Sequence, residues 1–383
     1  MRATRAIIHL ENLRFNIEEI RKKTGNVVKL CIPVKADAYG HGALKVAVAA
    51  IQAGATHLAV ASVQEGIELR ESGIVAPILS FSLPIPEEIP SIIEYGLTPF
   101  VFDAEYIADL ATKARQMNRV IPVHLKIDTG IGRTGRTEQH SPDHARTIAR
   151  EKTLQLMGTA THLSVSDSTD PDDIEYTKAQ IARFSEAVNS IRAEGIDPGI
   201  VNAANSGAVI ARPEALFDMV RPGIIVYGYL PSPQFAGLMT LKPVMELETQ
   251  VVSIKKIMAG TAVSYGRTWT ATEDTFIATL PIGYADGLNR RLSPGLRVRI
   301  GEREYPIVGR ICMDQCMVNI GPDPWVQRWD RVTVFGPAPA PYSADTLARI
   351  IGTIPYEVTC NINKRVPRVY VGDRPENRKG SPV

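Results

Sequence analysis

The sequence predicts an α/β chain in which a (β/α)8 TIM barrel is followed by a mainly β C-terminal domain. Short apolar, β-branched runs alternate with segments of helical spacing over the first 230 residues, and eight such runs can be counted. Helical periodicity then nearly vanishes from about residue 245 onward, which indicates a second domain of another class. Because counting strands cannot show closure, an open doubly wound sheet remains the structural alternative.

The predicted elements of the barrel follow from these runs. Helical spacing is clearest in the segments 104–116 and 174–194. Eight alternating units match a barrel, which typically spans about 250 residues. The predicted strands lie near residues 28–36, 56–62, 77–82, 98–103, 121–129, 154–164, 199–205 and 218–227.

The second domain is predicted from apolar runs separated by Gly, Pro and Asp. A helical pattern returns only at 344–351, and Leu230–Gly237 contains two prolines and a glycine, as expected of a linker. We therefore expect residues 1–235 to form the barrel and residues 236–383 the β domain. The runs are Thr249–Ile257, Thr275–Ile282, Leu296–Ile300 and Arg331–Phe335.

Composition excludes several classes of function. The 43 basic and 41 acidic residues leave a net charge of +2, so no basic field is available to hold nucleic acid. Four cysteines without a supporting histidine pair argue against a zinc site and indicate free thiols in a reducing compartment. Neither a signal-peptide core nor an apolar run long enough to span a membrane is found, so a cytoplasmic location is expected.

Unusual polar residues fall at the predicted carboxyl ends of the strands, where barrels place their active sites. Lys35 ends the first strand, after an apolar run, and small residues follow it. A lysine at such a strand end can be a solvated side chain. It can also be a desolvated amine suited to forming a Schiff base with an aldehyde. The other residues at strand ends are Arg133, His162, Asn205, Ser206 and Arg221.

Two further features leave alternatives open. Alternation in the fifth strand places Lys126 on one face with His124 and Asp128, and that face can point into the barrel or outward. Ser206 opens a helix after the seventh strand and can bind phosphate or act as a plain N-cap. The segment Gly130–Gly135 reads G-x-G-x-x-G, but it follows the fifth strand, which disfavours a dinucleotide site.

Ten short blocks follow one another in a fixed order from about residue 5 to residue 370. In the first domain these are Pro33–Gly42, Lys126–Arg133, Thr161–Ser164, Asn205–Ser206 and Arg221–Gly228. In the second they are Ser264–Thr268, Gly283–Gly287, Gly309–Gln315, Pro355–Glu357 and Arg365–Arg368. Together they resemble the alanine racemase family, and Pro33–Gly42 is similar to its cofactor-lysine motif.

The resemblance implies pyridoxal 5'-phosphate bound as a Schiff base on Lys35. It also implies a head-to-tail homodimer with shared active sites. Lys35 and Tyr265 of the other subunit would be the acid–base groups on opposite faces of the substrate. The implied reaction is racemisation of L-alanine to D-alanine, which supplies peptidoglycan synthesis; neither nucleic acid nor membrane is an expected partner.

The resemblance also implies supporting roles. His162 would lie beside the pyridine ring, and Arg221 would donate to the ring nitrogen. Arg133 and the Met313 N–H would bind the substrate carboxylate, and Lys126 would be carbamylated. The cofactor phosphate would be held by Tyr39, Ser206, Gly223, Ile224 and Tyr356.

This sequence departs from the family pattern near two of these positions. Leu163–Ser166 differs from the expected continuation after the histidine, and Ser264 stands where glycine is common. A serine or broader amino-acid racemase is therefore an alternative. A barrel-type amino-acid decarboxylase is disfavoured by Arg221, since that class pairs the ring nitrogen with a carboxylate. A non-catalytic pyridoxal-phosphate carrier would need no β domain.

Overall fold

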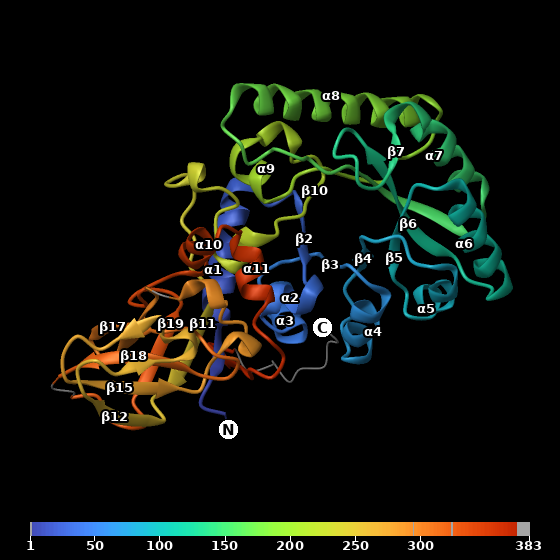
Figure 1. Ribbon diagram of the computed structural model, residues 1–383. Coiled ribbons are helices and arrows are strands. Elements are labelled where there is room, and N and C mark those ends of the chain that lie inside the picture. The colour runs from blue at the N-terminus through green and yellow to red at the C-terminus, as the bar shows by residue number, and fades with distance from the viewer. Residues whose placement is uncertain (1, 294, 323–324, 374–383) are drawn as a thin grey trace. The chain divides into compact units, whose positions relative to one another are not determined.

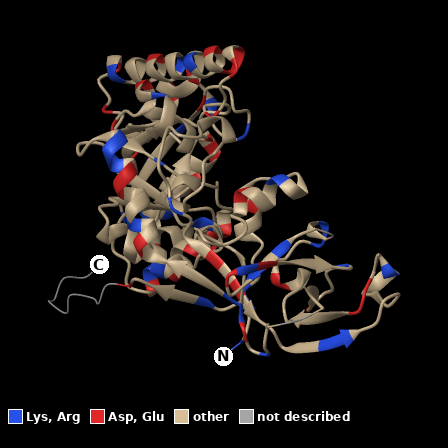
Figure 2. Ribbon diagram, turned by 90° about the vertical axis from the view of Figure 1, so that its left-hand side faces the viewer, with Lys and Arg blue, Asp and Glu red and all other residues tan. Residues whose placement is uncertain are grey.

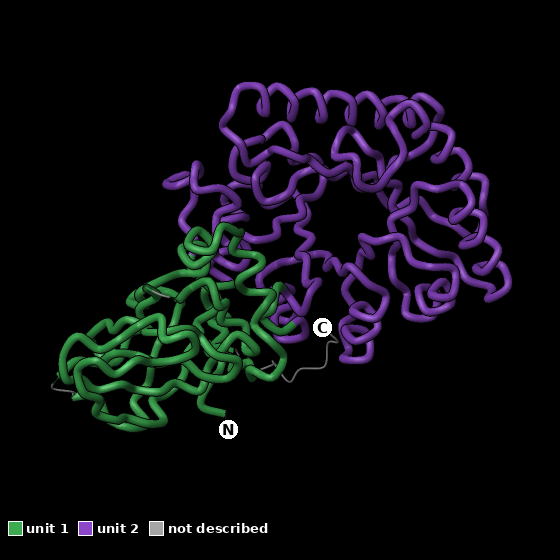
Figure 3. The backbone as a smooth tube through the Cα atoms, viewed as in Figure 1, with its two compact units in different colours: residues 1–13, 39–42, 242–375 green, residues 14–38, 43–241, 376–383 purple. Residues whose placement is uncertain are grey.

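The computed structural model describes residues 2–293, 295–322 and 325–373. Packing divides this chain into two compact units (Figure 3). Among the described residues, the barrel unit holds Arg14–Ala38 and Ala43–Leu241, and the β unit holds Arg2–Leu13, Tyr39–Gly42 and Lys242–Asp373. The predicted division placed all of residues 1–235 in the barrel. The structure instead groups strand β1 (Arg5–His9) with the β unit, because β1 pairs with strands of that unit.

The barrel predicted from the sequence is confirmed. In the described chain, eight parallel strands follow one another in the order β5-β4-β3-β2-β10-β9-β8-β6, and the pairing of β5 with β6 closes the ring (Figure 1). A short strand, β7 (Arg136–Thr137), adds to the edge of β6. The eight strands are β2 (Lys29–Pro33), β3 (His57–Val60), β4 (Ile78–Ser80), β5 (Thr98–Val101), β6 (Ile121–Asp128), β8 (Leu154–Ala160), β9 (Ile200–Asn202) and β10 (Met219–Val220).

Helices cover the outside of these strands (Figure 1). Local sequence sets where they begin: the Asp103 carboxylate accepts hydrogen bonds from the first turn of α6, and Ser62 with Glu65 forms a capping box on α4. The predicted helices at 104–116 and 174–194 correspond to α6 and α8. The helices up to the end of the barrel are α1 (Leu10–Thr24), α2 (Lys35–Gly40), α3 (Ala43–Gln52), α4 (Val63–Glu71), α5 (Ile89–Glu94), α6 (Ala104–Gln116), α7 (Ser141–Arg150), α8 (Pro171–Ala193) and α9 (Ser206–Ala211).

Strand β6 separates two environments within the barrel unit. Val123, Leu125 and Ile127 join a buried cluster with apolar residues of α6, α7 and α8. Because side chains alternate along a strand, His124 and Lys126 face the opposite side, the barrel interior. Both are buried, at 1% and 4% exposure, and the His124 ring stacks on Phe100 with centroids 5.8 Å apart. The reading of Lys126 as a surface lysine is therefore wrong.

The β unit is built on a nine-stranded sheet in the described residues, ordered β12-β15-β18-β17-β16-β19-β11-β1-β20. Alternating burial in β18, for example, leaves one face of the strand on the core. Two helices, α10 (Ala344–Ile351) and α11 (Pro355–Cys360), accompany the sheet. Its later strands are β11 (Met245–Gln250), β12 (Ser253–Ile257), β15 (Thr275–Leu280), β16 (Arg297–Ile300), β17 (Arg303–Val308), β18 (Cys316–Gly321), β19 (Arg331–Phe335) and β20 (Arg368–Val371), and β13 (Ala262–Val263) and β14 (Trp269–Thr270) form a separate hairpin.

The distribution of charged residues and the state of the cysteines follow what the composition indicated. Figure 2 shows basic and acidic segments interspersed along the ribbon rather than gathered by sign. All four cysteines are free thiols. Among the described helices, none is both long and apolar enough to cross a membrane.

Candidate active site

The candidate residues of the barrel unit follow the carboxyl ends of its strands. Lys35 comes two residues after β2, Arg133 follows β6, and His162 comes two residues after β8. Arg221 directly follows β10. The strand register also places Lys126 and Asn202 at the same level of the barrel, because Lys126 pairs with Ala160 and Ala160 pairs with Asn202 across three neighbouring strands. The structure therefore places each of these residues at the carboxyl end of a barrel strand, which is where barrels carry their active sites.

Within α2 (Lys35–Gly40), the backbone after Lys35 turns in the left-handed sense, which sequence reasoning did not predict. Ala36, Asp37, Ala38 and Tyr39 have φ between 51° and 54°. That conformation costs roughly 1–2 kcal/mol per residue for L-amino acids and needs compensating contacts. Glu65 supplies one, since its carboxylate accepts a 2.7 Å hydrogen bond from the Ala36 N–H.

A second contact holds the far end of the same turn. The Asp37 carboxylate accepts a 2.8 Å hydrogen bond from the Ala43 N–H. Lys35, half-buried at the start of the turn, is thus held between β2 and an anchored, irregular segment. This backbone fixes where the lysine side chain leaves the chain.

Arg221 is fixed from several directions inside the barrel. Its guanidinium donates to the Asn202 side-chain oxygen, to Thr161 O at 2.5 Å and to Ala203 O at 3.3 Å. Burial lowers the pKa of Arg221 to about 10, which still leaves the group cationic at neutral pH. The site therefore holds a rigid cation. Sequence reasoning missed Asn202, although an asparagine ending an apolar strand was a usable signal.

The other titratable groups of the barrel interior respond to this positive charge. Burial, and next the charge of Arg221, lower the pKa of Lys126 to about 7. Burial, then Arg221, Arg133, Lys126 and Lys35, lower the pKa of His162 well below its usual value, so the imidazole is neutral. Lys126 donates to Ile127 O at 2.8 Å. The interior therefore carries an excess of cations, which suits an anionic ligand.

The loop that carries Arg133 is organised by one carboxylate. Asp128 accepts hydrogen bonds from the N–H groups of Gly130, Ile131 and Gly132 at 2.9 Å, 3.0 Å and 3.2 Å. The segment Gly130–Gly135 then leads into β7, not into a helix. A dinucleotide fingerprint requires a helix at that point, so this geometry argues against the dinucleotide interpretation.

Ser206 and Gly223 lie in direct contact. The Gly223 N–H donates to the Ser206 hydroxyl at 2.8 Å. The N-cap of α9 is Asn205, so the plain N-cap interpretation of Ser206 is wrong. The prediction of a strand through Ile224 is also wrong: β10 ends at Val220, and Ile224–Tyr227 forms the 3-10 helix η4.

In the β unit, Tyr39 and Tyr356 form an aromatic pair. Their ring centroids lie 5.7 Å apart at an interplanar angle of 88°. Gly40 makes this approach possible, because a Cβ there would lie 2.1 Å from Thr359 O. Burial, then the charges of Tyr356 and Cys360, raise the pKa of the Tyr39 phenol, which therefore stays protonated and can donate a hydrogen bond.

Tyr265 and Met313 are exposed side chains of the β unit. Tyr265, at 71% exposure, lies in the tip between β13 and β14, and Met313 is 53% exposed. The Met313 carbonyl accepts from the Ala285 N–H at 3.0 Å, and Cys312 O accepts from the Tyr284 N–H at the same distance. These bonds tie the segment that contains Met313 to the turn η7 (Tyr284–Asp286).

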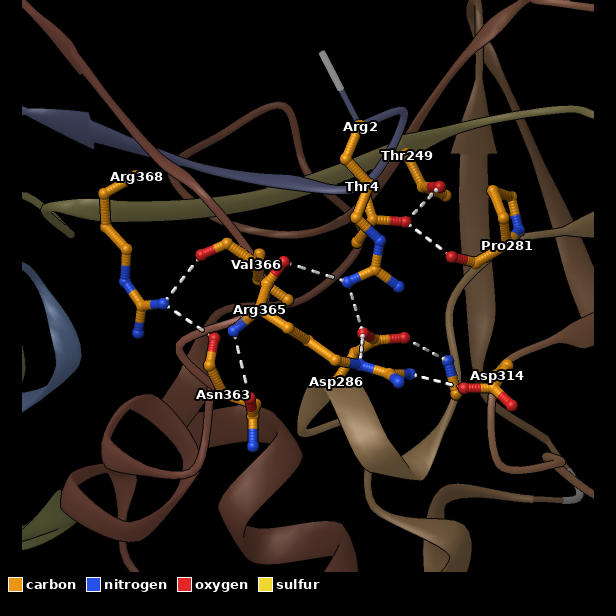
Figure 4. A network of polar contacts seen from close by, with 11 residues as sticks. Arg2, Thr4, Thr249, Pro281, Asp286, Asp314, Asn363, Arg365, Val366 and Arg368 are labelled. Atoms are coloured by element: carbon orange, nitrogen blue, oxygen red, sulfur yellow. Dashed lines mark hydrogen bonds and ion pairs between the residues drawn. The ribbon is translucent and has the colours of Figure 1, made fainter.

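An ion-pair network joins the turn η7 to the residue that follows Met313 (Figure 4). The Asp286 carboxylate is fully buried and pairs with Arg2 at 2.6 Å and with Arg365 at 2.7 Å. Arg365 also pairs with Asp314, the residue after Met313, at 2.6 Å. Burial alone would raise the pKa of Asp286, but hydrogen bonds from the two arginines lower it, so the carboxylate stays charged.

Comparisons with known proteins agree on one family. The family models described as "Alanine racemase, N-terminal domain" and "Alanine racemase, C-terminal domain" match residues 8–231 and 244–370. The chain is 59% identical to the alanine racemase of Treponema denticola over 377 residues, covering 97% of this chain and 99% of that protein. The alanine racemase of Treponema pallidum is 48% identical and is covered completely, against 97% of this chain.

The chain belongs to the alanine racemase family.

Solved structures support the same assignment. An alanine racemase from Clostridium difficile superposes with a TM-score of 0.91 at 36% identity, covering 97% of this chain and 96% of that chain. The alanine racemase of a D-cycloserine-producing Streptomyces lavendulae gives 0.90 at 33% identity, with 98% of both chains covered. Alanine racemases are isomerases, and the enzyme class predicted from the sequence is confirmed.

The two departures from the alanine racemase pattern have definite structural settings. Ser164 donates through its hydroxyl to the Gln180 side chain at 3.0 Å. Ser264 donates to Arg310 O at 2.7 Å. Each hydroxyl is thus used in an internal hydrogen bond of its own unit.

Proposed function

We propose that this alanine racemase homologue converts L-alanine to D-alanine with pyridoxal 5'-phosphate, using Lys35 and Tyr265 as two acid–base groups. The observation that carries the proposal is the cationic interior of the barrel, where Arg221 is locked by Asn202 and backbone oxygens. A homodimer in which Tyr265 and Met313 complete the site of a second copy is part of the proposal, as are the supply of D-alanine for peptidoglycan and a cytoplasmic location.

The residues present fit an anionic cofactor. Lys126, Arg133 and Arg221 are close enough to act on the pKa of the neutral His162. The charges of Arg221 and Arg133 also lower the pKa of Lys126. Ser206 and Gly223 offer a hydroxyl and a backbone segment that can turn toward a phosphate, together with Ile224. The Tyr39 and Tyr356 phenols, which pair within the β unit, would be further donors to the phosphate by the resemblance to the family.

Pyridoxal 5'-phosphate would supply a conjugated ring that stabilises negative charge at the substrate α-carbon. Lys35 would hold the cofactor and move the α-proton on one face. Tyr265 would move it on the other. A well-placed general acid or base contributes about 10²–10⁴-fold to rate. Arg221 would donate to the ring nitrogen without accepting its proton, because a guanidinium stays charged. This role disfavours a decarboxylase.

Two groups would orient the substrate carboxylate. Arg133 is exposed at the end of a loop that Asp128 organises. The Met313 N–H donates to no acceptor within the described residues, so it is available to a ligand. The network of Asp286, Arg365 and Asp314 restrains that N–H. A carboxylate held at two points presents its α-carbon in a defined orientation.

We also propose that Lys126 is carbamylated. Addition of CO2 requires the neutral amine, and a pKa of about 7 supplies a large neutral fraction near neutral pH. The neutral lysine nitrogen bonds to the CO2 carbon and releases one proton, so a neutral amine becomes an anionic carbamate beside Arg133. The charged form must first lose a proton of its own, so two protons leave when the ammonium is converted. Intact-mass measurement in bicarbonate and in CO2-free buffer tests this directly.

The decisive experiment is to incubate the purified, cofactor-loaded protein with L-alanine and to measure D-alanine. Repeating it over a panel of L-amino acids distinguishes an alanine racemase from a serine or broader racemase. Lys35→Ala should abolish the visible absorbance of lysine-bound cofactor and the activity. A protein that binds cofactor but forms no D-enantiomer from any amino acid would be a carrier and would refute the proposal.

Tyr265→Phe tests the two-base mechanism. In deuterated water, we expect this variant to lose α-proton exchange by about 10²-fold or more for one enantiomer, while exchange of the other persists. The asymmetry is expected because each base serves one face of the substrate. Equal, small losses for both enantiomers would contradict a two-base mechanism.

A further inference from the structure

The tip that carries Tyr265 has an unusual backbone. The residue before it, Ser264, has φ 69° and ψ 179°. That region is populated almost only by glycine, because a Cβ is crowded there. The tip is otherwise short: Val263 pairs with Trp269 directly beneath it, in the last register position of the hairpin. A side chain has therefore been placed at a position where the backbone disfavours one.

The Ser264 side chain makes a specific contact from this position. Its hydroxyl donates to Arg310 O at 2.7 Å and lies 3.6 Å from the Cys312 sulfur. The two segments are packed tightly, since a Cβ on Gly309 would lie 2.6 Å from the Ser264 Cβ. Ser264 therefore ties the tip to the segment Gly309–Met313.

That segment is itself held in place. Cys312 donates its N–H to Gln315 O at 2.9 Å, and its carbonyl accepts from Tyr284. The ion pair between Arg365 and Asp314 fixes the residue that follows Met313. The Ser264 hydroxyl thus connects an exposed tip to a framework with several independent attachments.

We propose that Ser264 is a positioning residue that fixes the backbone of Tyr265 relative to the Met313 segment. Its Cβ restricts the backbone, and its hydroxyl selects the one arrangement in which Arg310 O is reached. The tyrosine and the Met313 N–H are then presented as one rigid pair. This inference rests on the proposed function, in which Tyr265 serves only one face of the substrate.

The test compares two substitutions that differ only in backbone freedom. Ser264→Ala removes the hydroxyl and keeps the Cβ. Ser264→Gly removes the hydroxyl and also relieves the crowded backbone, so it should have the higher melting temperature of the two. Ser190→Ala is the control, because the Ser190 hydroxyl also donates to a backbone carbonyl, Glu186 O at 3.0 Å, on α8 of the barrel unit.

The readouts are the melting temperature and the rate of α-proton exchange in deuterated water for each alanine enantiomer. We expect Ser264→Ala to lose about tenfold in exchange of the enantiomer affected by Tyr265→Phe, with the other changed less than about twofold. Ser264→Gly should lose at least as much, despite its higher melting temperature. Ser190→Ala should leave both exchange rates unchanged.

A purely structural role predicts the opposite order, with exchange recovering in Ser264→Gly as stability recovers. That result, or equal losses for the two enantiomers, would overturn the inference while leaving the proposed function intact. If Tyr265→Phe itself shows equal losses, the two-base proposal fails and the inference fails with it. The two failures are therefore distinguishable.

Discussion

The positive charge inside the barrel should have a measurable effect, through Lys126, on the free energy of unfolding. Its pKa falls from the usual 10.5 to about 7, first because of burial and next because of Arg221. At 1.36 kcal/mol per pKa unit, this shift lowers the free energy of unfolding by about 5 kcal/mol when Lys126 is fully charged. At pH 7, where half of the Lys126 side chains in the folded state are neutral, the loss is about 4 kcal/mol. Because the unfolded chain binds more protons between pH 7 and 10.5, this contribution makes stability rise with pH across that window.

Lys126→Met removes the charge and keeps an unbranched side chain. In CO2-free buffer, we expect the variant to exceed the parent in free energy of unfolding by on the order of 4 kcal/mol near pH 7, with the difference vanishing near pH 10. Urea unfolding at both pH values measures this, and Lys152→Met, at an exposed lysine, is the control. Equal stability near pH 7, or a difference that grows with pH, would refute the reasoning. Bicarbonate should narrow the gap if Lys126 is carbamylated.

Three further predictions concern other parts of the chain. Arg221→Glu should raise transamination relative to racemisation, because a carboxylate can keep the ring nitrogen protonated; an unchanged product ratio would contradict this. Arg365→Ala should raise KM for alanine about tenfold with a smaller change in kcat, because the ion pair to Asp314 no longer restrains the Met313 N–H. Steady-state kinetics with both enantiomers test this prediction. An effect on kcat alone would argue against a role in carboxylate binding. Phe184→Ala should cost about 3–5 kcal/mol of unfolding free energy, since this ring is fully buried in the cluster around β6, and a loss below 1 kcal/mol would show that the cluster collapses around the gap.

Local pattern was sufficient for most of the fold. All eight predicted barrel strands are present, because buried parallel strands are short apolar runs bounded by turns. The last predicted strand, near residues 218–227, is much shorter than expected, since only Met219–Val220 forms a strand and Ile224–Tyr227 is helical. Those residues are buried on every side, so they carry no periodicity that could distinguish a strand from a helix.

The domain boundary shows a different limit. The N-terminal strand β1 is an ordinary apolar run, and nothing within it indicates its partners. Its hydrogen bonds go to β11 and β20, which lie more than two hundred residues away in the sequence. Strand pairing at that separation depends on the whole topology, so the first residues were assigned to the barrel by position alone.

The sequence by itself determined the class of fold, the strand ends that bear Lys35, His162 and Arg221, and the family to which the chain belongs. Those features are local: they depend on residue type, spacing and the order of short motifs. Only the tertiary structure decided that Lys126 faces inward, that Asn202 fixes Arg221, and that Ser264 joins the Tyr265 tip to the Met313 segment. Each of these depends on burial or on a hydrogen bond between segments that are distant in the sequence, and no local pattern records either.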